Sequence, residues 1–440
     1  MLATMTTRET LLSNGLKLLV RENTENEIVA IRILFKTGNR YETASNYGIS
    51  NLAFRMLLKG TESRSAEQIA DDLDSIGAHL EVGVEKDAGG LMLQCTAPVL
   101  DEALEILWDV ANRSVFPADR LRWEKKRVKM EILEDEDSPM TYTFRRFWEN
   151  LYGSHPYSAL SKGYPETLSR MTKARVKKHY LTCGSSSGIV ATIVGHVNAT
   201  RITQWFESHF GTRQLDSKRP SEPDDVVLLA CSGSEKHTQH QRMVEAENLV
   251  LGYLAPCVLS SDFPAMKVLD GVLGGSMDSR LFVEVREKRG LAYSVGSTYI
   301  PRRGPGALAI YLGTEPSNHE EALSQCLLQV EQLQNDLVPE DELRRTIQYI
   351  CGLHIMGQES NMGQAEMLAS STFFDLGSGY ISEYPALIEA VTAEDVRHVA
   401  QKYLTDYASA VTTPCPSEPS STQGDIKRPM LDSEDLDALE

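Results

Sequence analysis

The sequence contains no run of roughly 18 apolar residues, so it predicts no membrane-spanning helix and no membrane insertion. Its N-terminal stretch lacks the apolar core of a signal peptide, and it is too short before the first strand-like residues to be a transit peptide. The seven cysteines are an odd number and form no Cys-x-x-Cys pair, which argues against a disulfide framework. Together these absences predict a cytoplasmic protein with reduced thiols.

Basic residues are outnumbered, with 44 Lys and Arg against 62 Asp and Glu, and the formal net charge is −18. Such an excess repels nucleic acid phosphates and anionic membranes, so we expect neither as a partner. The hydrophobic content of 41% and the charged content of 24% are ordinary for a globular protein. At 440 residues the chain is too long for one core and predicts roughly two to four domains.

The same order of predicted elements occurs twice along the chain. The first half has strand-like sequence over 9–36, then two helices, two strands over 79–95 and two further helices. The second half repeats this order from a strand at 248–254, with an offset of roughly 220 residues. Short stretches match as well, for example Glu102-Ala103-Leu104 and Glu321-Ala322-Leu323. The pattern predicts an internal duplication of an α+β unit.

Composition sets the expected domain boundaries. We expect an N-terminal domain over 1–212, an exposed linker rich in Pro, Ser and charge over 213–241, a homologous C-terminal domain over 242–413 and a disordered acidic tail over 414–440. The last ten residues combine acidic side chains with Leu431, Leu436 and Leu439. We interpret them as a solvated tail, with a short partner-binding helix as the alternative.

Residues 48–61 have apolar side chains at intervals of three and four, which predicts a helix with one face in the core and with Asn46 as its candidate N-cap. The segment resembles the helix of pitrilysin/insulinase-type zinc peptidases (the inverzincins) that carries His-x-x-Glu-His and continues into Met-x-x-Lys-Gly-Thr. The frame of that pattern is kept at Gly48, Met56, Lys59, Gly60 and Thr61.

The chemistry of the pattern is replaced, because its His, Glu and His positions hold Asn51, Phe54 and Arg55. Zinc hydrolysis needs three protein ligands and a general base. Asn51 is a poor zinc ligand, Phe54 cannot accept a proton, and Arg55 is a permanent cation that repels Zn²⁺. The resemblance therefore implies a zinc peptidase fold with no zinc in this chain.

On a later helix, the family has two glutamates seven residues apart, the second of them a metal ligand. Glu124 and Glu131 match these positions. They are either remnants of the metal site or ordinary helix-surface charges. Our sharper hypothesis is that Arg55 replaces the metal charge and pairs with Glu131. A guanidinium more than about 6 Å from both glutamates would contradict it, because charge attraction is strong only at short range.

Residues 279–295 resemble the C-terminal signature of the family, in which an Arg and a Tyr seven residues apart bind substrate backbone and stabilise the tetrahedral intermediate. Arg286 and Tyr293 match. A cation and a phenolic donor can both face a developing oxyanion. Without the resemblance, Arg286 would be interpreted as a solvated helix charge and Tyr293 as a packed strand residue.

Two other segments bear on substrate binding. The glycine-rich residues 271–276 loosely resemble a flexible segment in the non-catalytic subunit of mitochondrial processing peptidase. Residues 77–81 occupy the position of the family's peptide-binding edge strand, but Glu81 and Val82 depart from its pattern. The departure leaves open whether this strand receives peptide by strand addition.

The resemblance implies two homologous halves, each a mostly antiparallel sheet with helices packed on one face, joined as a clam shell of the α+β class. In small members two chains pair, one carrying zinc and the other carrying Arg and Tyr. We therefore expect a non-catalytic, substrate-binding subunit of a heterodimeric zinc processing peptidase, which supplies Arg286 and Tyr293 in trans. The expected partners are a zinc-bearing relative and a peptide substrate, with no cofactor in this chain.

Other functions stay open at this point. The chain could be a structural relative of the core subunits of the respiratory cytochrome bc1 complex, or a peptide-binding homodimer without catalysis. The Arg286 and Tyr293 pair argues against the first, since a purely structural subunit does not need it. An autonomous peptidase would require a metal site that the sequence does not reveal.

Overall fold

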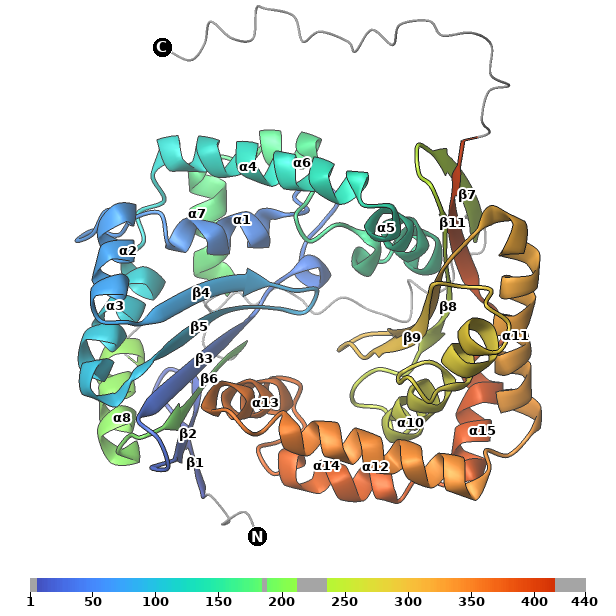
Figure 1. Ribbon diagram of the computed structural model, residues 1–440. Coiled ribbons are helices and arrows are strands. Elements are labelled where there is room, and N and C mark those ends of the chain that lie inside the picture. Colours follow the sequence, from blue (N-terminus) through green and yellow to red (C-terminus); the bar gives the residue numbers. More distant parts are fainter. Residues whose placement is uncertain (1–5, 184–187, 212–235, 416–440) are drawn as a thin grey trace, which may run out of the picture.

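The computed structural model describes residues 6–183, 188–211 and 236–415. Two lobes, each built on its own sheet, lie opposite one another (Figure 1). Most of the expected linker and nearly all of the expected acidic tail lie outside the described residues. The last residues of the expected linker, 237–241, belong to strand β7 (His237–Arg242), and Pro414 ends strand β11 (Ala408–Pro414). No helix within these described ranges is long and apolar enough to cross a membrane.

The first sheet has six strands in the order β1-β2-β6-β3-β5-β4, all antiparallel except β2 with β6. Its strands are β1 (Thr7–Leu11), β2 (Lys17–Glu22), β3 (Ile28–Lys36), β4 (His79–Val84), β5 (Ala88–Thr96) and β6 (Ile189–Gly195). One face of the sheet forms the larger core with helices of the same half. These helices are α1 (Ile49–Leu57), α2 (Ala66–Ser75), α3 (Leu100–Arg113), α4 (Ala118–Asp137), α7 (Lys173–Cys183) and α8 (Ala199–Phe206).

The second sheet has the order β7-β11-β8-β10-β9, again with one parallel pair, β7 with β11. Its other strands are β8 (Glu247–Ala255), β9 (Ser294–Ile300) and β10 (Gly306–Thr314). The order reproduces β2-β6-β3-β5-β4 strand for strand, so the sequence repeat is a repeat of topology. Its own helices again cover one face, namely α10 (Phe263–Leu273), α11 (His319–Asn335), α12 (Glu340–Met356) and α15 (Ala393–Tyr403). The predicted α+β clam shell of two homologous halves is confirmed.

Each sheet also receives, on its other face, one helix from the opposite half (Figure 1). Helix α5 (Pro139–Tyr152) of the first half packs on β8 and β11, with Phe147 in a small core beside Val250 and Ala410. Helix α13 (Asn361–Phe373) of the second half packs on β3 and β6. Thr143 Oγ1 donates to Thr412 Oγ1 at 2.7 Å, and Thr192 Oγ1 donates to the Ala365 carbonyl at 2.8 Å. This exchange of helices α5 and α13 joins the two halves through buried apolar surface. The sequence did not predict it.

Helix α1 begins differently from the prediction. Its N-cap is Gly48 in the left-handed region, with φ of 91°, and not Asn46. The backbone N–H groups of Gly48 and Ser50 donate to the buried Glu42 carboxylate at 2.9 and 2.8 Å, so this carboxylate satisfies N–H groups that the first turn leaves open. Burial raises the pKa of Glu42. The left-handed backbone at residue 48 explains a glycine there, since a Cβ would lie 2.5 Å from the Lys162 carbonyl oxygen.

Candidate functional site

Phe54 fills the position of the family's general base with an apolar ring. The side chain is 1% exposed, and its ring packs edge-on against Phe35 and Tyr180, with centroid separations of 5.4 and 5.6 Å. Gly89 on β5 leaves room for it, because a Cβ there would lie 3.0 Å from two carbons of the Phe54 ring. A buried aromatic cluster of this kind excludes the water that a hydrolytic site would need.

Arg55, on the next residue of α1, reaches α4. Its Nη1 donates to Glu131 Oε1 at 2.9 Å and its Nη2 to Glu131 Oε2 at 2.5 Å. The Arg55 Nη1 also lies 3.5 Å from Glu124 Oε2, and Lys59 Nζ lies 2.9 Å from Glu124 Oε1. The predicted pairing of Arg55 with Glu131 is therefore confirmed, and both glutamates belong to the same ion-pair network. The parallel two-bond geometry is the strong form of an Arg–carboxylate contact.

The network sets the charge state of Glu131. Partial burial would raise its pKa, but the hydrogen bonds from Arg55 and the positive charges of Arg55, Lys162 and Arg127 outweigh burial and lower the pKa. Lys162 Nζ is 4.0 Å and Arg127 Nε is 3.3 Å from the carboxylate. Glu131 is thus held ionised and saturated by cations of the protein itself.

The residues at the zinc position do not fit zinc. The guanidinium of Arg55 takes the carboxylate that a metal would share, and two like charges cannot occupy that place together. Asn51 Oδ1 is buried and has no hydrogen-bond partner among the described residues. No cluster of three or more His, Cys, Asp or Glu side chains that could hold a metal occurs within 6–183, 188–211 and 236–415.

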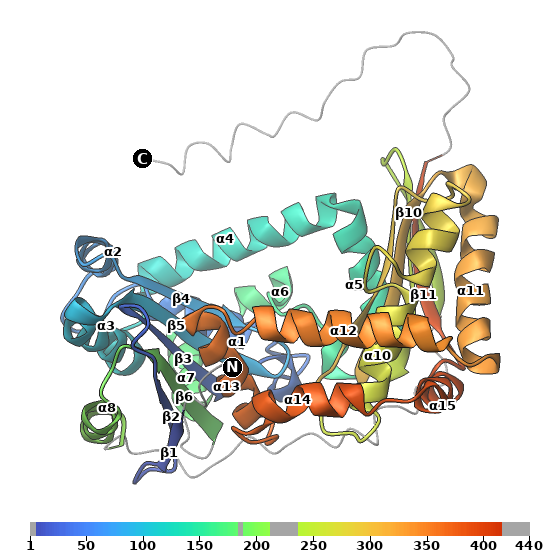
Figure 2. The ribbon, with the colours of Figure 1, turned by 60° about the horizontal axis from the view of Figure 1, so that its bottom comes forward.

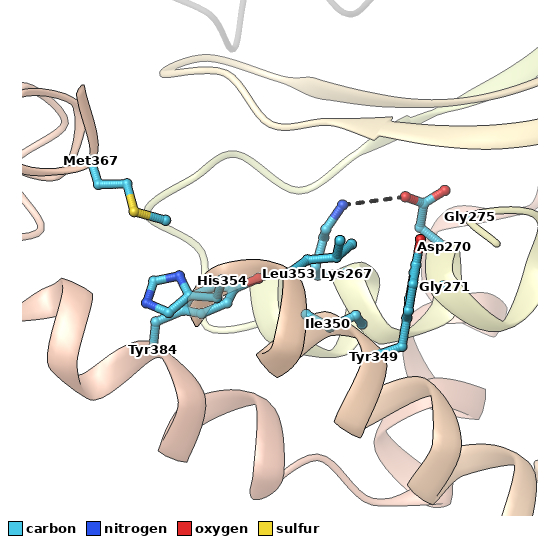
Figure 3. A pocket seen from close by; sticks show the side chains of 10 residues that line it. All are labelled: Lys267, Asp270, Gly271, Gly275, Tyr349, Ile350, Leu353, His354, Met367 and Tyr384. Atoms are coloured by element: carbon cyan, nitrogen blue, oxygen red, sulfur yellow. Dashed lines mark hydrogen bonds and ion pairs between the residues drawn. The ribbon is translucent and has the colours of Figure 1, made fainter. Parts of the chain in front are cut away.

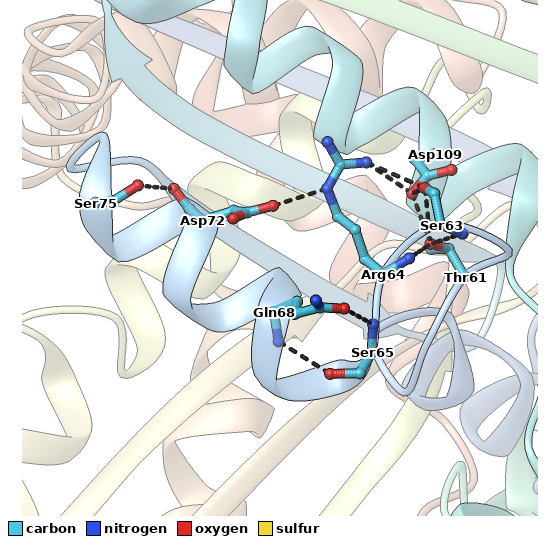
Figure 4. Close-up of polar contacts among 8 residues, drawn as sticks. All are labelled: Thr61, Ser63, Arg64, Ser65, Gln68, Asp72, Ser75 and Asp109. Atoms are coloured by element: carbon cyan, nitrogen blue, oxygen red, sulfur yellow. Dashed lines mark hydrogen bonds and ion pairs between the residues drawn. The ribbon is translucent and has the colours of Figure 1, made fainter.

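The loop after the helix keeps the Lys-Gly-Thr frame for a structural reason (Figure 4). Thr61 Oγ1 and Ser63 Oγ both donate to Asp109 Oδ2 at 2.6 Å, and Arg64 Nη1 donates to the same oxygen at 2.8 Å. Arg64 Nε donates to Asp72 at 2.8 Å, which ties the loop to α2. Burial would raise the pKa of Asp109, but these donors lower it. The anchored loop fixes the end of α1 against α3, so it positions Lys59 beside Glu124.

Arg286 lies on the short π-helical turn Phe282–Glu287, which buries Val285 and exposes Arg286. The guanidinium carbon stacks 4.9 Å from the centroid of the Phe282 ring. The other cations of this segment are neutralised by carboxylates: Arg280 by Glu342, and Lys288 and Arg289 by Glu284. In the part of the chain that the structure describes, Arg286 has no carboxylate partner, so it remains available to bind an external acceptor.

Tyr293 precedes β9 and is 56% exposed. Its backbone N–H donates to the Gly313 carbonyl at 3.0 Å, and its ring lies directly on Gly313 of β10. A Cβ at Gly313 would stand 2.2 Å from Tyr293 Cζ, so glycine is required for this ring position. The phenol is thus held against the sheet while much of its surface stays open, which suits a hydrogen-bond donor for a ligand.

The structure therefore brings together some of the predicted site residues and leaves others apart. Arg55, Glu124 and Glu131 form one network in the first half. Arg286 and Tyr293 lie in the second half, and among the described residues no hydrogen bond or ion pair joins them to each other or to Arg55. The chain contains a neutralised metal position and a separate, exposed Arg and Tyr.

In the second half, a hollow of about 280 Å³ opens between α10 and α12, the helices that correspond to α1 and α4 (Figure 3). Lys267 Nζ lies 3.5 Å from Asp270 Oδ2 at one side, and His354 stacks on Tyr384 at 4.6 Å at the other. Gly271 and Gly275 of the glycine-rich segment also line the hollow. A side chain at Gly271 would clash with Thr346 of α12 at 2.6 Å, which gives at least this glycine a packing role.

The two halves also meet where the turn before β5 touches the turn before β10. The Tyr157 hydroxyl donates to Asp87 and accepts from the Gly304 backbone N–H at 3.1 Å, and the Arg303 backbone N–H donates to Asp87 Oδ2 at 3.2 Å. Next to them, burial and then the charge of Arg302 lower the pKa of Lys86 to about 7. A cavity of about 330 Å³ lies beside this contact. No local pattern predicts this contact, because the two turns are more than 200 residues apart in the sequence.

The edge strand expected at 77–81 is strand β4, which lies at the outer end of the first sheet and is hydrogen-bonded on one side to β5. On it, His79 Nε2 lies 2.7 Å from Glu81 Oε1. Strand β9 has the same place at the end of the second sheet. On β9, however, the Ser297 backbone N–H already donates to the Gly274 carbonyl at 3.2 Å, so β4 is the edge whose backbone groups can pair with an extended peptide.

Comparison with known proteins gives the family. The sequence pattern described as insulinase (peptidase family M16) matches residues 17–160, and that described as the peptidase M16 inactive domain matches residues 170–350. An uncharacterised zinc protease of Bacillus subtilis is 29% identical over 420 residues, which cover 92% of this chain and 98% of the relative. One of Rickettsia felis is 26% identical over 94% of this chain and 98% of the relative.

Solved structures with the same fold include a peptidase M16 inactive domain from Pseudomonas fluorescens, with a TM-score of 0.84, 22% identity and coverage of 93% of this chain and 98% of that one. A protease from Helicobacter pylori has a TM-score of 0.85 at 20% identity, covering 93% and 100%. A chain of complex III2 from Candida albicans has a TM-score of 0.78 at 14% identity, covering 92% and 96%. These solved structures share the fold of this chain. The chain belongs to peptidase family M16, the insulinase family.

Proposed function

We propose that this chain is the non-catalytic, substrate-binding subunit of a heterodimeric zinc-dependent processing peptidase. The observation that carries the proposal is the contrast between Arg55 and Arg286. Arg55 is neutralised by Glu131 at the position of the metal, whereas Arg286 is the one cation of residues 280–289 without a carboxylate partner in the described structure. The positive charge of Arg55 is compensated within the chain, whereas the positive charge of Arg286 is not.

In the proposed pair, the zinc-bearing relative supplies the metal, which polarises the scissile carbonyl and its bound water. This chain contributes two donors from outside that metal site. The Arg286 guanidinium stabilises negative charge on a peptide carbonyl oxygen, and the Tyr293 hydroxyl donates a second hydrogen bond. Each side chain is placed by its surroundings, Arg286 by the Phe282 ring and Tyr293 by the surface of Gly313. Such preorganised donors cost little rearrangement when the oxyanion forms.

The substrate class in this proposal is an extended peptide. Strand β4 ends its sheet, and it can add a peptide strand through main-chain hydrogen bonds. Glu81 on β4 is exposed, so it would favour a peptide with basic residues. We expect the pair to work in the cytoplasm, in line with the odd cysteine count, and this chain to bind no cofactor itself.

A second candidate is a structural homodimer without catalysis. The likeness to a chain of complex III2 makes this class of function worth testing, although at 14% identity that likeness concerns the fold alone. The Arg55 network would serve it equally well, since it holds α1 to α4 without a metal. A purely structural homodimer, however, gives no reason for Arg286 to lack a carboxylate partner in the described structure.

The test is co-expression with a relative that carries an intact His-x-x-Glu-His helix, encoded in the same genome. The proposal expects a stable pair with one zinc ion, bound by the relative, and peptidase activity that neither chain shows alone. A homodimer that leaves the relative unbound, or full activity of the relative by itself, would contradict it. Light scattering coupled to gel filtration and metal analysis of the purified pair distinguish these outcomes.

A further inference from the structure

The cavity of about 330 Å³ at the contact between the halves has walls from both of them. The first half contributes strand β3 and the turn before β5, and the second half contributes the turn before β10 and helix α13. Figure 2 shows α13 between the two lobes, in line with its contacts to β3 and β6. The volume is at the lower end of the range of small-molecule sites. The wall includes Leu34, Lys86, Ile300, Arg302, Glu366 and Phe374, and we call this space the interlobe cavity.

Two cations in the wall of the interlobe cavity lack an acidic partner. Within the described ranges, no carboxylate oxygen lies within 4 Å of Lys86 Nζ or of the Arg302 guanidinium. Lys86 donates to the backbone carbonyl of Ala159. The Arg302 guanidinium stacks 4.9 Å from the centroid of the Tyr157 ring and contacts the Tyr152 hydroxyl. Its Nε is buried and has no hydrogen-bond partner among the described residues. A buried donor without an acceptor is unfavourable, so this guanidinium can gain from an added acceptor.

Three carboxylates also line the interlobe cavity, and none of them forms a direct ion pair with these two cations. Asp87 is buried, and its oxygens accept from the Tyr157 hydroxyl and, at 3.2 Å, from a backbone N–H of the opposite turn. Glu366 is paired with Arg32, at 2.5 Å. Glu85 is exposed to solvent. The two cations therefore remain without a direct counter-ion in the described structure.

The protonation of Lys86 reflects this lack of a counter-ion. Burial and the positive charge of Arg302 lower the pKa of Lys86 to about 7, although the negative charges of Glu42 and Asp87 act in the opposite direction. The loss of a proton from Lys86 is one way to relieve the repulsion between the two cations. A bound anion is another way, and it would keep the proton on Lys86.

The rest of the wall indicates what the anion would carry. Leu34, Ile300 and the neighbouring rings of Phe373 and Phe374 give it an apolar part. Such a part contributes to the binding of an anion with an apolar body but not to that of a bare inorganic ion. A carboxylate head offers two oxygens, which match the planar fork of a guanidinium.

We propose that the interlobe cavity binds a small organic carboxylate. The head of the ligand lies between Lys86 and Arg302, and its apolar body contacts Ile300 and Phe374. Because Lys86 belongs to the first half and Arg302 to the second, the ligand links the two lobes. The inference is independent of the proposed function, since it involves no residue of the proposed oxyanion site and no partner chain.

Isothermal titration calorimetry of the full chain with isocaproate, a branched carboxylate, tests the proposal. The comparison ligands are isocaproamide, which has the same body without the charge, and inorganic phosphate, which has no apolar body. We expect isocaproate to bind at least roughly tenfold more tightly than either, and Lys86→Met and Arg302→Met each to weaken its binding by a similar factor. The matched control is Lys267→Met, which removes a cation from the hollow between α10 and α12 and should bind isocaproate like the wild type.

Proton uptake gives a second readout that is specific to Lys86. A carboxylate beside the ammonium group raises the pKa of Lys86, so binding above about pH 7 should draw a proton from the buffer. Titrations in two buffers with different heats of ionisation measure this uptake. We expect uptake in the wild type and in Lys267→Met, and none in Lys86→Met.

The proposal would be overturned if isocaproate did not bind to the folded wild type, or if isocaproamide bound equally well. Phosphate binding as tight as that of isocaproate would overturn the organic ligand class. Binding that neither Lys86→Met nor Arg302→Met weakens would place the site elsewhere. Circular dichroism checks the folding of each variant. Lys86→Met keeps most of the apolar stem of the side chain, so it provides the test even if Arg302→Met, which also loses the stack on Tyr157, fails to fold.

Discussion

The guanidinium of Arg55 and the carboxylate of Glu131 form two parallel hydrogen bonds, 2.9 and 2.5 Å long, between α1 and α4. The pair occupies the place at which an active relative shares a metal ion between two helices. A fixed cation thus provides the same link between the helices, without an exchangeable ligand. This arrangement explains why the helix stays ordered after its ligand residues are replaced.

Substituting Arg55 with Met should destabilise the chain by about 1–3 kcal/mol, because the partly buried carboxylates of Glu131 and Glu124 lose their shared partner. Urea denaturation measures the change. The double variant Arg55→Met/Glu131→Gln should recover part of the loss, since it removes the unpaired charge as well. A single variant as stable as the wild type would mean that the network contributes nothing.

The zinc position should be restorable in part. Asn51→His/Arg55→His places two imidazoles one turn apart on α1, and it frees Glu131 as the third ligand. We expect this variant to bind one zinc ion in calorimetry, whereas the wild type binds none at that place. The control Asn51→His/Arg55→His/Glu131→Gln should lose the binding. Peptidase activity is not expected, because Phe54 still occupies the position of the base.

Lys86, at the contact between the halves, should give stability a distinct pH dependence. Its pKa is lowered by burial and by Arg302 to about 7, below the unfolded value of about 10.4. Between these values the unfolded chain binds the proton and the folded chain does not, so the free energy of unfolding rises with pH. Below about pH 7 both states are protonated and the rise ends. In Lys86→Met the rise between pH 7 and 9.5 should be smaller, as measured by urea denaturation at several pH values. An identical slope in both proteins would contradict the assignment.

Gly313→Ala should displace Tyr293 without unfolding the sheet. The added Cβ would collide with the tip of an exposed ring, which can rotate away into solvent, so the free energy of unfolding should change by less than about 0.5 kcal/mol. Activity of the reconstituted pair should fall, as is also expected for Tyr293→Phe. Gly352→Ala on α12 is the matched control, since a Cβ there meets nothing within 4 Å and the residue lies outside the proposed peptide-binding strand. Unchanged activity of Gly313→Ala would argue against a role for the ring position.

The sequence predicted the parts of the molecule that depend on local pattern. The duplication, the helix at 49–57 and the pairing of Arg55 with Glu131 follow from periodicity and from residue positions within a known frame. The exchange of α5 and α13 could not be predicted, because an amphipathic pattern shows that one face of a helix is buried but not which sheet buries it. Phe147 and Ala365 are ordinary apolar residues of such faces.

Contacts that leave no periodic pattern in the sequence were also missed. Glu42 caps α1 from a preceding turn, and Asn46, which has the better capping side chain by composition, hydrogen-bonds to Thr43 instead. The seat of the Tyr293 ring on Gly313 depends on the register of β9 with β10. The only trace of this contact in the sequence is a glycine within a strand, which weakly indicates that another group packs closely on the strand.

The most direct test of the proposed role of Arg286 compares the kcat/KM of the reconstituted pair carrying Arg286→Ala with that of the pair carrying Arg289→Ala. Both variants remove one arginine from the same segment, but Arg289 is already paired with Glu284. The proposed role predicts a loss of roughly 100-fold for Arg286→Ala, as expected for one lost oxyanion donor, with Arg289→Ala near the wild type. Equal activity of the two variants would contradict it.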